Sequence, residues 1–195
     1  YSICILRMEC PVSSSGIQSR LSHAQWTLKP QDLAVAFKLV CLKGQRLPYA
    51  ALAQALQLSP FEAHACITRL SASRLLTEVD GVPNLVMPAF RPLVLQGAVY
   101  FFPPVRGEVT VGFPTAQGVE PLKSKVMFAE ELPPVWPHPD GTTRGVTLLP
   151  LYPKLPVAAL KDPAFYELLA LFDALRIGQA RERELVRGML EERLK

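Results

Sequence analysis

The side chains that could do acid–base chemistry are scattered along the chain. His138, Asp140, Arg144 and Asp173 can be arranged on paper into an active site, because imidazole and carboxyl groups transfer protons and a guanidinium group stabilises negative charge. Nothing in their spacing requires such a site. The sequence also contains no phosphate-binding loop, dinucleotide fingerprint or nucleophile elbow. It therefore predicts a protein that is not an enzyme and that needs no cofactor.

The four cysteines, Cys4, Cys10, Cys41 and Cys66, do not predict a metal site. None forms a C-x-x-C pair, and no histidine stands at metal-ligand spacing from any of them. Cys41 and Cys66 fall within helical apolar patterns, which favours buried free thiols and a reducing cytoplasm. No apolar run reaches the roughly 20 residues of a membrane helix, and the first residues do not read as a signal peptide. We therefore expect a cytoplasmic protein without a membrane partner.

A second kind of chemistry, the recognition of DNA, is possible around residues 59–74. Ser59 precedes Pro60, and Glu62 follows three residues after the serine, which is a capping box at the start of a helix over residues 60–73. The capped N-terminus can point at a phosphate or a base edge. The positions predicted to face outward are Phe61, His64, Ala65, Thr68 and Arg69. Two interpretations are open for His64, a contact with DNA or a histidine that is simply exposed. Two are also open for Phe61, a contact with a thymine methyl group or packing on the preceding helix.

Basic residues near this helix are few. Between Lys29 and Phe90 there are six basic and four acidic side chains, so the net charge is +2. Lys43, Arg46 and Arg74 are the candidates for phosphate contacts. Since phosphate neutralisation supplies most non-specific affinity, a single copy would bind DNA weakly, and a two-fold dimer would double the contacts.

The elements that must position these residues follow from local signals. A helix is predicted from Pro30 to a C-cap at Gly44, and a second helix from Pro48 to Leu56. Asp80-Gly81 predicts a hairpin turn between strands at 75–78 and 82–87, with Pro83 marking an edge strand. A helix over 89–98 and an extended segment over 99–102 are expected next.

Residues 52–70, LAQALQLSPFEAHACITRL, resemble the helix-turn-helix of bacterial transcription regulators. With the preceding helix and the following hairpin, the resemblance extends to the winged form over about residues 29–88. It implies that the helix over 60–73 reads the major groove of double-stranded DNA. Three positions depart from the family pattern. Gln57 stands where the turn usually has glycine and is expected at positive φ, Arg74 replaces a frequent capping glycine, and Ala65 replaces a long polar side chain.

The rest of the chain is apolar enough to build a core. Hydrophobic residues make up 49% and charged residues 19%, and the net charge is +4. Of the 19 prolines, 11 lie between residues 102 and 156, among recurring aromatic and aliphatic residues, so we expect irregular structure with short strands. Asp162-Pro163 starts a broadly apolar helix that ends near Gly178. The helix from Ala180 to Leu194 has a thin apolar seam that pairs across a dimer axis or docks on its own chain.

The sequence as a whole predicts an α+β protein in four segments. These are a flexible extension (1–25), a winged helix-turn-helix (26–88), a proline-rich irregular segment (89–160) and C-terminal helices that could mediate dimerisation (161–195). The expected function is that of a bacterial, sequence-specific regulator of transcription that binds double-stranded DNA as a homodimer. The alternative is a protein-interaction adaptor, or an antitoxin-like partner, built on the same fold.

Overall fold

The computed structural model describes residues 27–195 except residues 46, 80 and 126–131. The predicted flexible extension, with Cys4 and Cys10, lies outside the described residues.

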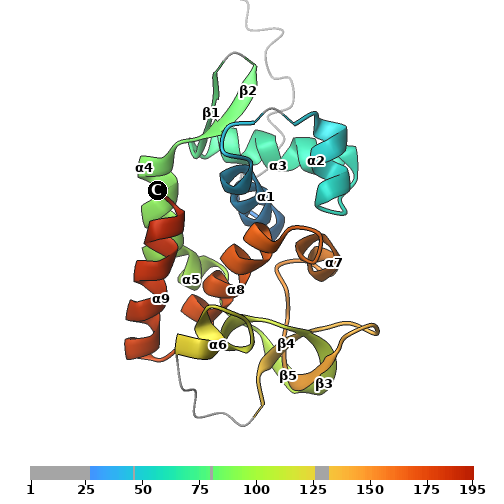
Figure 1. The fold of residues 1–195 in the computed structure, drawn as a ribbon. Coiled ribbons are helices and arrows are strands. Elements are labelled where there is room, and N and C mark those ends of the chain that lie inside the picture. The colour runs from blue at the N-terminus through green and yellow to red at the C-terminus, as the bar shows by residue number, and fades with distance from the viewer. Residues whose placement is uncertain (1–26, 46, 80, 126–131) are drawn as a thin grey trace, which may run out of the picture.

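Three helices open the described part of the chain (Figure 1). They are α1 (Pro30–Leu42), α2 (Tyr49–Ala55) and α3 (Pro60–Ala72). The first and third begin with a proline, which suits the first helical position because the N–H it lacks would have no partner there. The C-cap of α1 is Lys43, one residue before the predicted Gly44, and both residues have positive φ, 48° and 78°. The three predicted helices are confirmed to within one or two residues.

A two-stranded antiparallel sheet follows α3. Strands β1 (Leu76–Val79) and β2 (Val82–Leu85) pair with Val79 opposite Val82 and Leu76 opposite Leu85. Gly81 has a φ of 72°, which glycine adopts at no steric cost. The predicted hairpin is confirmed, although Asp80 in its turn lies outside the described residues. Pro83 has no N–H group to donate to the neighbouring strand. It is accommodated because both strands of a two-stranded sheet are edge strands.

The segment after the hairpin is helical throughout. It consists of α4 (Met87–Pro92), a π-helical turn (Leu93–Gly97) and α5 (Ala98–Phe101). The prediction of extended backbone over 99–102 is therefore wrong for residues 99–101, and α5 ends before Phe102. The π turn directly follows Pro92, which has no N–H to donate to the helical ladder.

The proline-rich middle contains three short strands, β3 (Arg106–Pro114), β4 (Pro134–Pro137) and β5 (Thr143–Leu148). β3 pairs antiparallel with both others, and β4 pairs in parallel with β5, so the three strands close on themselves. A Cβ atom at Gly112 would lie 2.1 Å from the carbonyl oxygen of Trp136, so glycine is what allows this close approach. The expectation of ordered short strands is confirmed.

Five further helical elements complete the described part of the chain. They are a 3-10 turn (Ala116–Gly118), α6 (Leu122–Lys125), α7 (Leu155–Ala159), α8 (Pro163–Ile177) and α9 (Ala180–Arg193). The side chain of Asp162 accepts hydrogen bonds from the N–H groups of Ala164 and Phe165, at 3.1 and 3.2 Å. This N-cap and the C-cap at Gly178 confirm the predicted ends of α8. α7 was not predicted.

α8 lies at the centre of the molecule, between the N-terminal helices and the small sheet (Figure 1). It packs against α1, α7, α9 and the 3-10 turn, and its residues from Leu168 to Arg176 are all buried. Phe172 contacts Phe37 of α1, with ring centroids 5.5 Å apart. The predicted seam of α9 docks on its own chain through Met189, Leu190 and Leu194, which are buried. Leu185, which was predicted to belong to the seam, is 43% exposed, and Val186 is buried instead.

Polar contacts tie the predicted segments together. Lys38 of α1 forms a 2.6 Å ion pair with Asp162, the N-cap of α8. The Tyr152 hydroxyl donates to the carbonyl of Leu56 at 2.8 Å, which joins the loop before α7 to the end of α2. One buried apolar cluster includes residues of all three segments after residue 26. The chain is therefore a mixed α and β fold with small sheets. No helix in its described part is long and apolar enough to cross a membrane.

Candidate functional site

The turn between α2 and α3 fixes how α3 is presented. Gln57 has a φ of 55°, as expected from its place in the sequence pattern. Its N–H donates to the carbonyl of Gln54 at 3.2 Å, and the N–H of Leu58 donates to Ala53 at 2.9 Å. These bonds satisfy carbonyl groups at the end of α2, and the turn connects the two helices through four residues, 56–59. Ala53 is 1% exposed, which fits the predicted close crossing of the two helices.

The capping box at the start of α3 is confirmed. The Ser59 hydroxyl accepts from the N–H of Glu62 at 3.2 Å, and the Glu62 carboxylate accepts from the Ser59 N–H at 2.8 Å and from its hydroxyl at 2.7 Å. The backbone and side-chain hydrogen bonds from Ser59 hold the pKa of Glu62 below its usual value. A carboxylate therefore already occupies this helix N-terminus, where Ser59 was predicted to help bind a phosphate.

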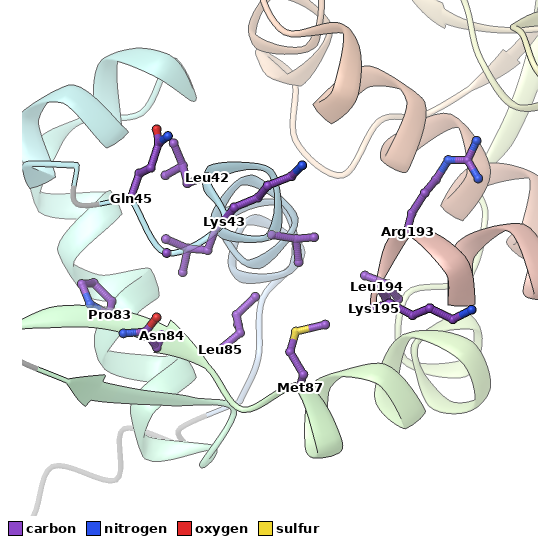
Figure 2. A pocket seen from close by; sticks show the side chains of 13 residues that line it. Leu42, Lys43, Gln45, Pro83, Asn84, Leu85, Met87, Arg193, Leu194 and Lys195 are labelled. Atoms are coloured by element: carbon purple, nitrogen blue, oxygen red, sulfur yellow. The ribbon is translucent and has the colours of Figure 1, made fainter.

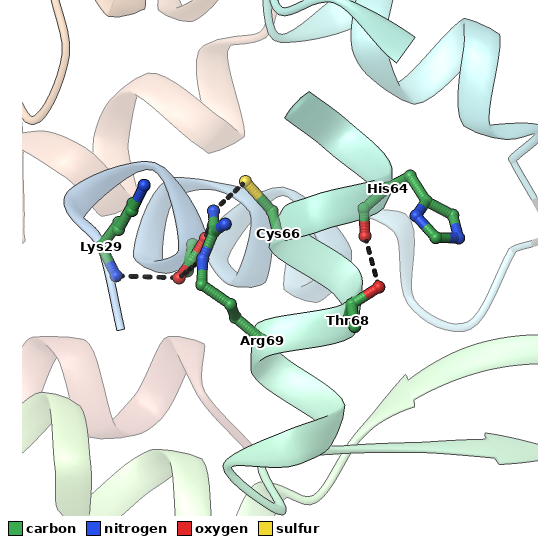
Figure 3. A network of polar contacts seen from close by, with 6 residues as sticks. Lys29, His64, Cys66, Thr68 and Arg69 are labelled. Atoms are coloured by element: carbon green, nitrogen blue, oxygen red, sulfur yellow. Dashed lines mark hydrogen bonds and ion pairs between the residues drawn. The ribbon is translucent and has the colours of Figure 1, made fainter. Parts of the chain in front are cut away.

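Arg69 requires a correction, because it does not face outward. Its Nε and Nη2 atoms donate to the two carboxylate oxygens of Asp32 at 2.7 and 2.6 Å. Asp32 is completely buried in the first turn of α1, and its Oδ2 also accepts from the N–H of Lys29 at 2.8 Å. Figure 3 shows Arg69 and Cys66 directed toward α1, and His64 on another side of α3. The guanidinium holds α3 against α1, and its charge is already paired with a carboxylate of the same chain.

His64, Thr68 and Phe61 form the accessible face of α3. His64 is exposed, and its ring lies 5.6 Å from the ring of Tyr49 on α2. The Thr68 hydroxyl donates to the carbonyl of His64 at 2.9 Å (Figure 3). Phe61 is 82% exposed, so it does not pack on α2. Ala65 is half-buried beside it and lines a shallow 140 Å³ pocket between α3 and the start of α1.

The cations proposed to flank α3 lie in different places. Arg74 is exposed just beyond α3 with a φ of 58°, and the N–H of Leu75 donates to Leu70 at 3.0 Å, so a left-handed cap forms without glycine. Lys43 lines a second pocket with residues of α1, β2, α4 and the C-terminal end, and no residue of α3 lines that pocket. Arg46 lies outside the described residues.

Two residues of the α3 surroundings were not predicted. Tyr49, which is 44% exposed, lies beside His64. Lys154, in the loop before α7, lies close enough to Glu62 to contribute to the lowering of its pKa. No sequence signal indicates Lys154, because it is 92 positions from Glu62 along the chain and only the fold brings them together.

The four residues that could form an acid–base site are not brought together. Asp173 is buried and accepts hydrogen bonds from Thr115 Oγ1 at 2.8 Å, from Trp136 Nε1 at 2.7 Å and from Arg176. His138 lies at the end of β4 instead, where its Nδ1 accepts from the N–H of Asp140 at 3.1 Å. Among the described residues, no hydrogen bond or ion pair joins Asp173 to either of them or to Arg144. The Asp173 network holds α8 to the small sheet.

Cys41 and Cys66 are free thiols. Burial is the main cause that raises the pKa of Cys41 to about 11 and that of Cys66 to about 12, and nearby carboxylates contribute. Such thiols carry little thiolate and react slowly near neutral pH. In the described part of the chain, no three histidine, cysteine, aspartate or glutamate residues are grouped as metal ligands.

The chain matches no protein-family model, no curated protein and no solved structure. The physical character of the α3 face is therefore the basis on which a function can be proposed.

Proposed function

We propose that the protein is a winged helix-turn-helix DNA-binding protein that places α3 in the major groove of double-stranded DNA. The single observation that carries the proposal is the geometry around α3. A tight turn and a complete capping box present this helix, and the β1–β2 hairpin follows it directly. An α-helix with its side chains is about 10–12 Å in diameter, which suits a major groove about 12 Å wide, and the 13 residues of α3 give it a length of about 20 Å along the groove.

The chemistry of the accessible face supports the same function. His64 and Thr68 carry groups that exchange hydrogen bonds with base edges. The carboxylate of α3, Glu62, is bound within the capping box at one end of the helix. Lys154 lies near this end and Arg74 lies beyond the other end. These two cations are suitably placed to contact phosphates on either side of the groove.

Among the described residues near α3, few cations are free of an ion pair, which favours weak binding by a single copy. Arg69 and Lys38 each form an ion pair with a carboxylate of the same chain and contribute little to phosphate neutralisation. We therefore include a homodimer in the proposal, since two copies double the phosphate contacts. The role we propose is that of a bacterial regulator of transcription in the cytoplasm.

The test is binding to labelled DNA followed by fluorescence anisotropy at several salt concentrations. A preferred sequence is first selected from a random duplex library, and a duplex with the same bases in scrambled order is used for comparison. Arg74→Gln should weaken binding to both duplexes alike and reduce the salt slope by about one per bound copy. His64→Ala should weaken binding to the preferred duplex more than to the scrambled one, because base contacts specify and phosphate contacts position.

Lys123→Gln is the matched control for the loss of one positive charge. Lys123 is exposed on α6, which lies at the end of the molecule away from α3 (Figure 1). This variant should bind like the unchanged protein. Binding that is weak, equally strong on both duplexes and the same for all variants would contradict DNA recognition by α3.

One observation favours a second candidate, a protein-interaction adaptor or antitoxin-like partner. Phe61 is 82% and Tyr49 is 44% exposed, and both belong to the α2–α3 face. Exposed aromatic residues are typical of protein-interaction surfaces. The DNA experiment separates the two functions, because an adaptor would show little salt-dependent binding to either duplex.

A further inference from the structure

A pocket of about 360 Å³ opens on the molecule between α1, the hairpin and the C-terminal helix. Its walls come from the end of α1 and the residues after it, from β2 and the start of α4, and from residues 193–195 (Figure 2). It thus joins parts of the chain that are more than 100 residues apart. Its volume lies at the lower end of the roughly 300–1,000 Å³ range of ligand pockets.

The floor of this pocket is apolar. Leu85 and Met87 are half-buried and pack against the main core cluster, and Leu194 is fully buried. Leu39 and Val40 of α1 also line the pocket. Covering the half-buried Leu85 and Met87 with a hydrocarbon group would remove their exposed apolar surface from water, at roughly 25 cal/mol per Å².

The charged side chains of the lining are all positive. They are Lys43, Arg193 and Lys195, and no aspartate or glutamate lines the pocket. Arg193 is already paired through its Nε with Glu167 at 2.6 Å. Lys43 therefore provides the excess positive charge, and Figure 2 shows Lys43 and Lys195 on different sides of the apolar floor. An occupant that complements this lining has a hydrocarbon body and an anionic head.

We propose that this pocket is a binding site for a small amphipathic carboxylate. Its hydrocarbon part lies on Leu85 and Met87, above the buried Leu194, and its carboxylate faces Lys43. The site is separate from α3, so the inference goes beyond DNA binding and is tested without DNA.

The experiment compares three ligands of the same chain length, octanoate, octanamide and octylammonium, by calorimetric titration of the full chain. Amide and methyl NMR shifts locate the site. Octanoate should bind about three- to five-fold more tightly than octanamide, because an exposed charge pair is worth up to about 1 kcal/mol. Octylammonium should bind more weakly than either. The largest shifts should fall on Leu85, Met87 and Leu194.

Gln45→Glu is the variant that tests the role of charge. Gln45 is an exposed residue of the lining, and the change alters its charge but hardly its shape. It should weaken octanoate binding about three-fold or more and leave octanamide unchanged. Gln96→Glu makes the same change at an exposed residue that does not line the pocket, and should have no effect.

Four results would overturn the proposal. They are no binding of octanoate up to about 10 mM, equal binding of octanoate and octanamide, shifts that map away from the pocket, and equal effects of the two glutamate variants. None of these results depends on whether α3 binds DNA, so the two proposals fail separately.

Discussion

Arg69 shows how one side chain can be removed from a functional surface by a partner far away in the sequence. Its two hydrogen bonds to Asp32 are short, and Asp32 has no exposed surface. A buried carboxylate needs several donors to compensate for its lost hydration, and here Arg69 and the Lys29 N–H provide them. The pair fixes the angle between α1 and α3 and thereby positions the accessible face of α3.

We therefore predict that Asp32→Asn destabilises the protein by about 3 kcal/mol, because it leaves the Arg69 charge without its partner. Urea denaturation followed by circular dichroism measures the change. The double variant Asp32→Asn, Arg69→Met should recover part of this loss, since it no longer contains the unpaired cation. A double variant that loses the sum of the two single effects would show that the two groups are not coupled.

The environment of the Asp162 carboxyl group leads us to expect that the folded protein loses stability in acid. Burial raises the pKa of its carboxyl, but hydrogen bonds from Lys38 and from the N–H groups of Phe165 and Ala164 outweigh this effect and lower the pKa. A lowered folded-state pKa contributes stability that is present above about pH 4, the unfolded value, and is lost as the pH falls through the folded value. Asp162→Asn should therefore reduce the difference in unfolding free energy between pH 5 and pH 3.

The control for this pH dependence is Glu192→Gln, at an exposed position on α9. It should leave the difference between the two pH values as it is in the unchanged protein. An Asp162→Asn protein with the full pH dependence would contradict the role of the α1–α8 ion pair in acid stability.

At the scale of elements, the turn between α2 and α3 contains measurable strain. Gln57 adopts left-handed backbone, which costs a residue with a Cβ atom about 1–2 kcal/mol. Gln57→Gly removes this cost but makes the unfolded chain more flexible, so we expect a net stabilisation of about 0.5–1 kcal/mol. Gln54→Gly, inside α2, should instead destabilise by about 1 kcal/mol. Thermal unfolding of both variants checks the opposite signs.

The elements that local chemistry determines could be predicted from the sequence. Ser59, Pro60 and Glu62 indicate the start of α3, and Asp162 with Gly178 indicates both ends of α8, because caps depend on residues close in the chain. The helical conformation of residues 99–101 was missed, because Val99, Tyr100 and Phe101 are of types that favour strands locally. The buried residues are those on either side, Ala98 and Phe102, and no local pattern reveals their packing.

The candidate site was predictable only in part, for a similar reason. His64, Thr68 and Phe61 lie on the accessible face as helical periodicity indicates. Arg69 does not, because its partner Asp32 is 37 positions away and no short-range pattern reveals the pairing. Lys154 was missed because only the tertiary fold brings it near Glu62.

At the scale of the whole molecule, the N-terminal helices and α8 share one core. Phe37 of α1 contacts both Phe90 and Phe172, with ring centroids 5.8 and 5.5 Å apart. The broad apolar surface of α8, which could have indicated a dimer interface, is buried within the same chain. The homodimer therefore stays a prediction that rests on the need for more phosphate contacts.

Because of this shared core, Phe172→Ala should destabilise the N-terminal helices as well as α8. We expect a loss of about 3–5 kcal/mol, typical of a buried phenylalanine. Native-state hydrogen exchange should show the most protected amides of α1, α3 and α8 losing protection by the same free energy. Unchanged protection in α1 and α3 would instead indicate that the N-terminal helices fold independently of α8.

The central proposal, that α3 enters the major groove, is tested most directly by mapping where DNA contacts the protein. Amide NMR shifts of the full chain are followed while the selected duplex is added at low salt. The proposal predicts the largest shifts in α3 from Phe61 to Ala72, at Arg74 and in the β1–β2 hairpin, with little change in α9 or β3. Shifts that are absent, or that concentrate on α9 or the small sheet while α3 stays unchanged, would contradict it.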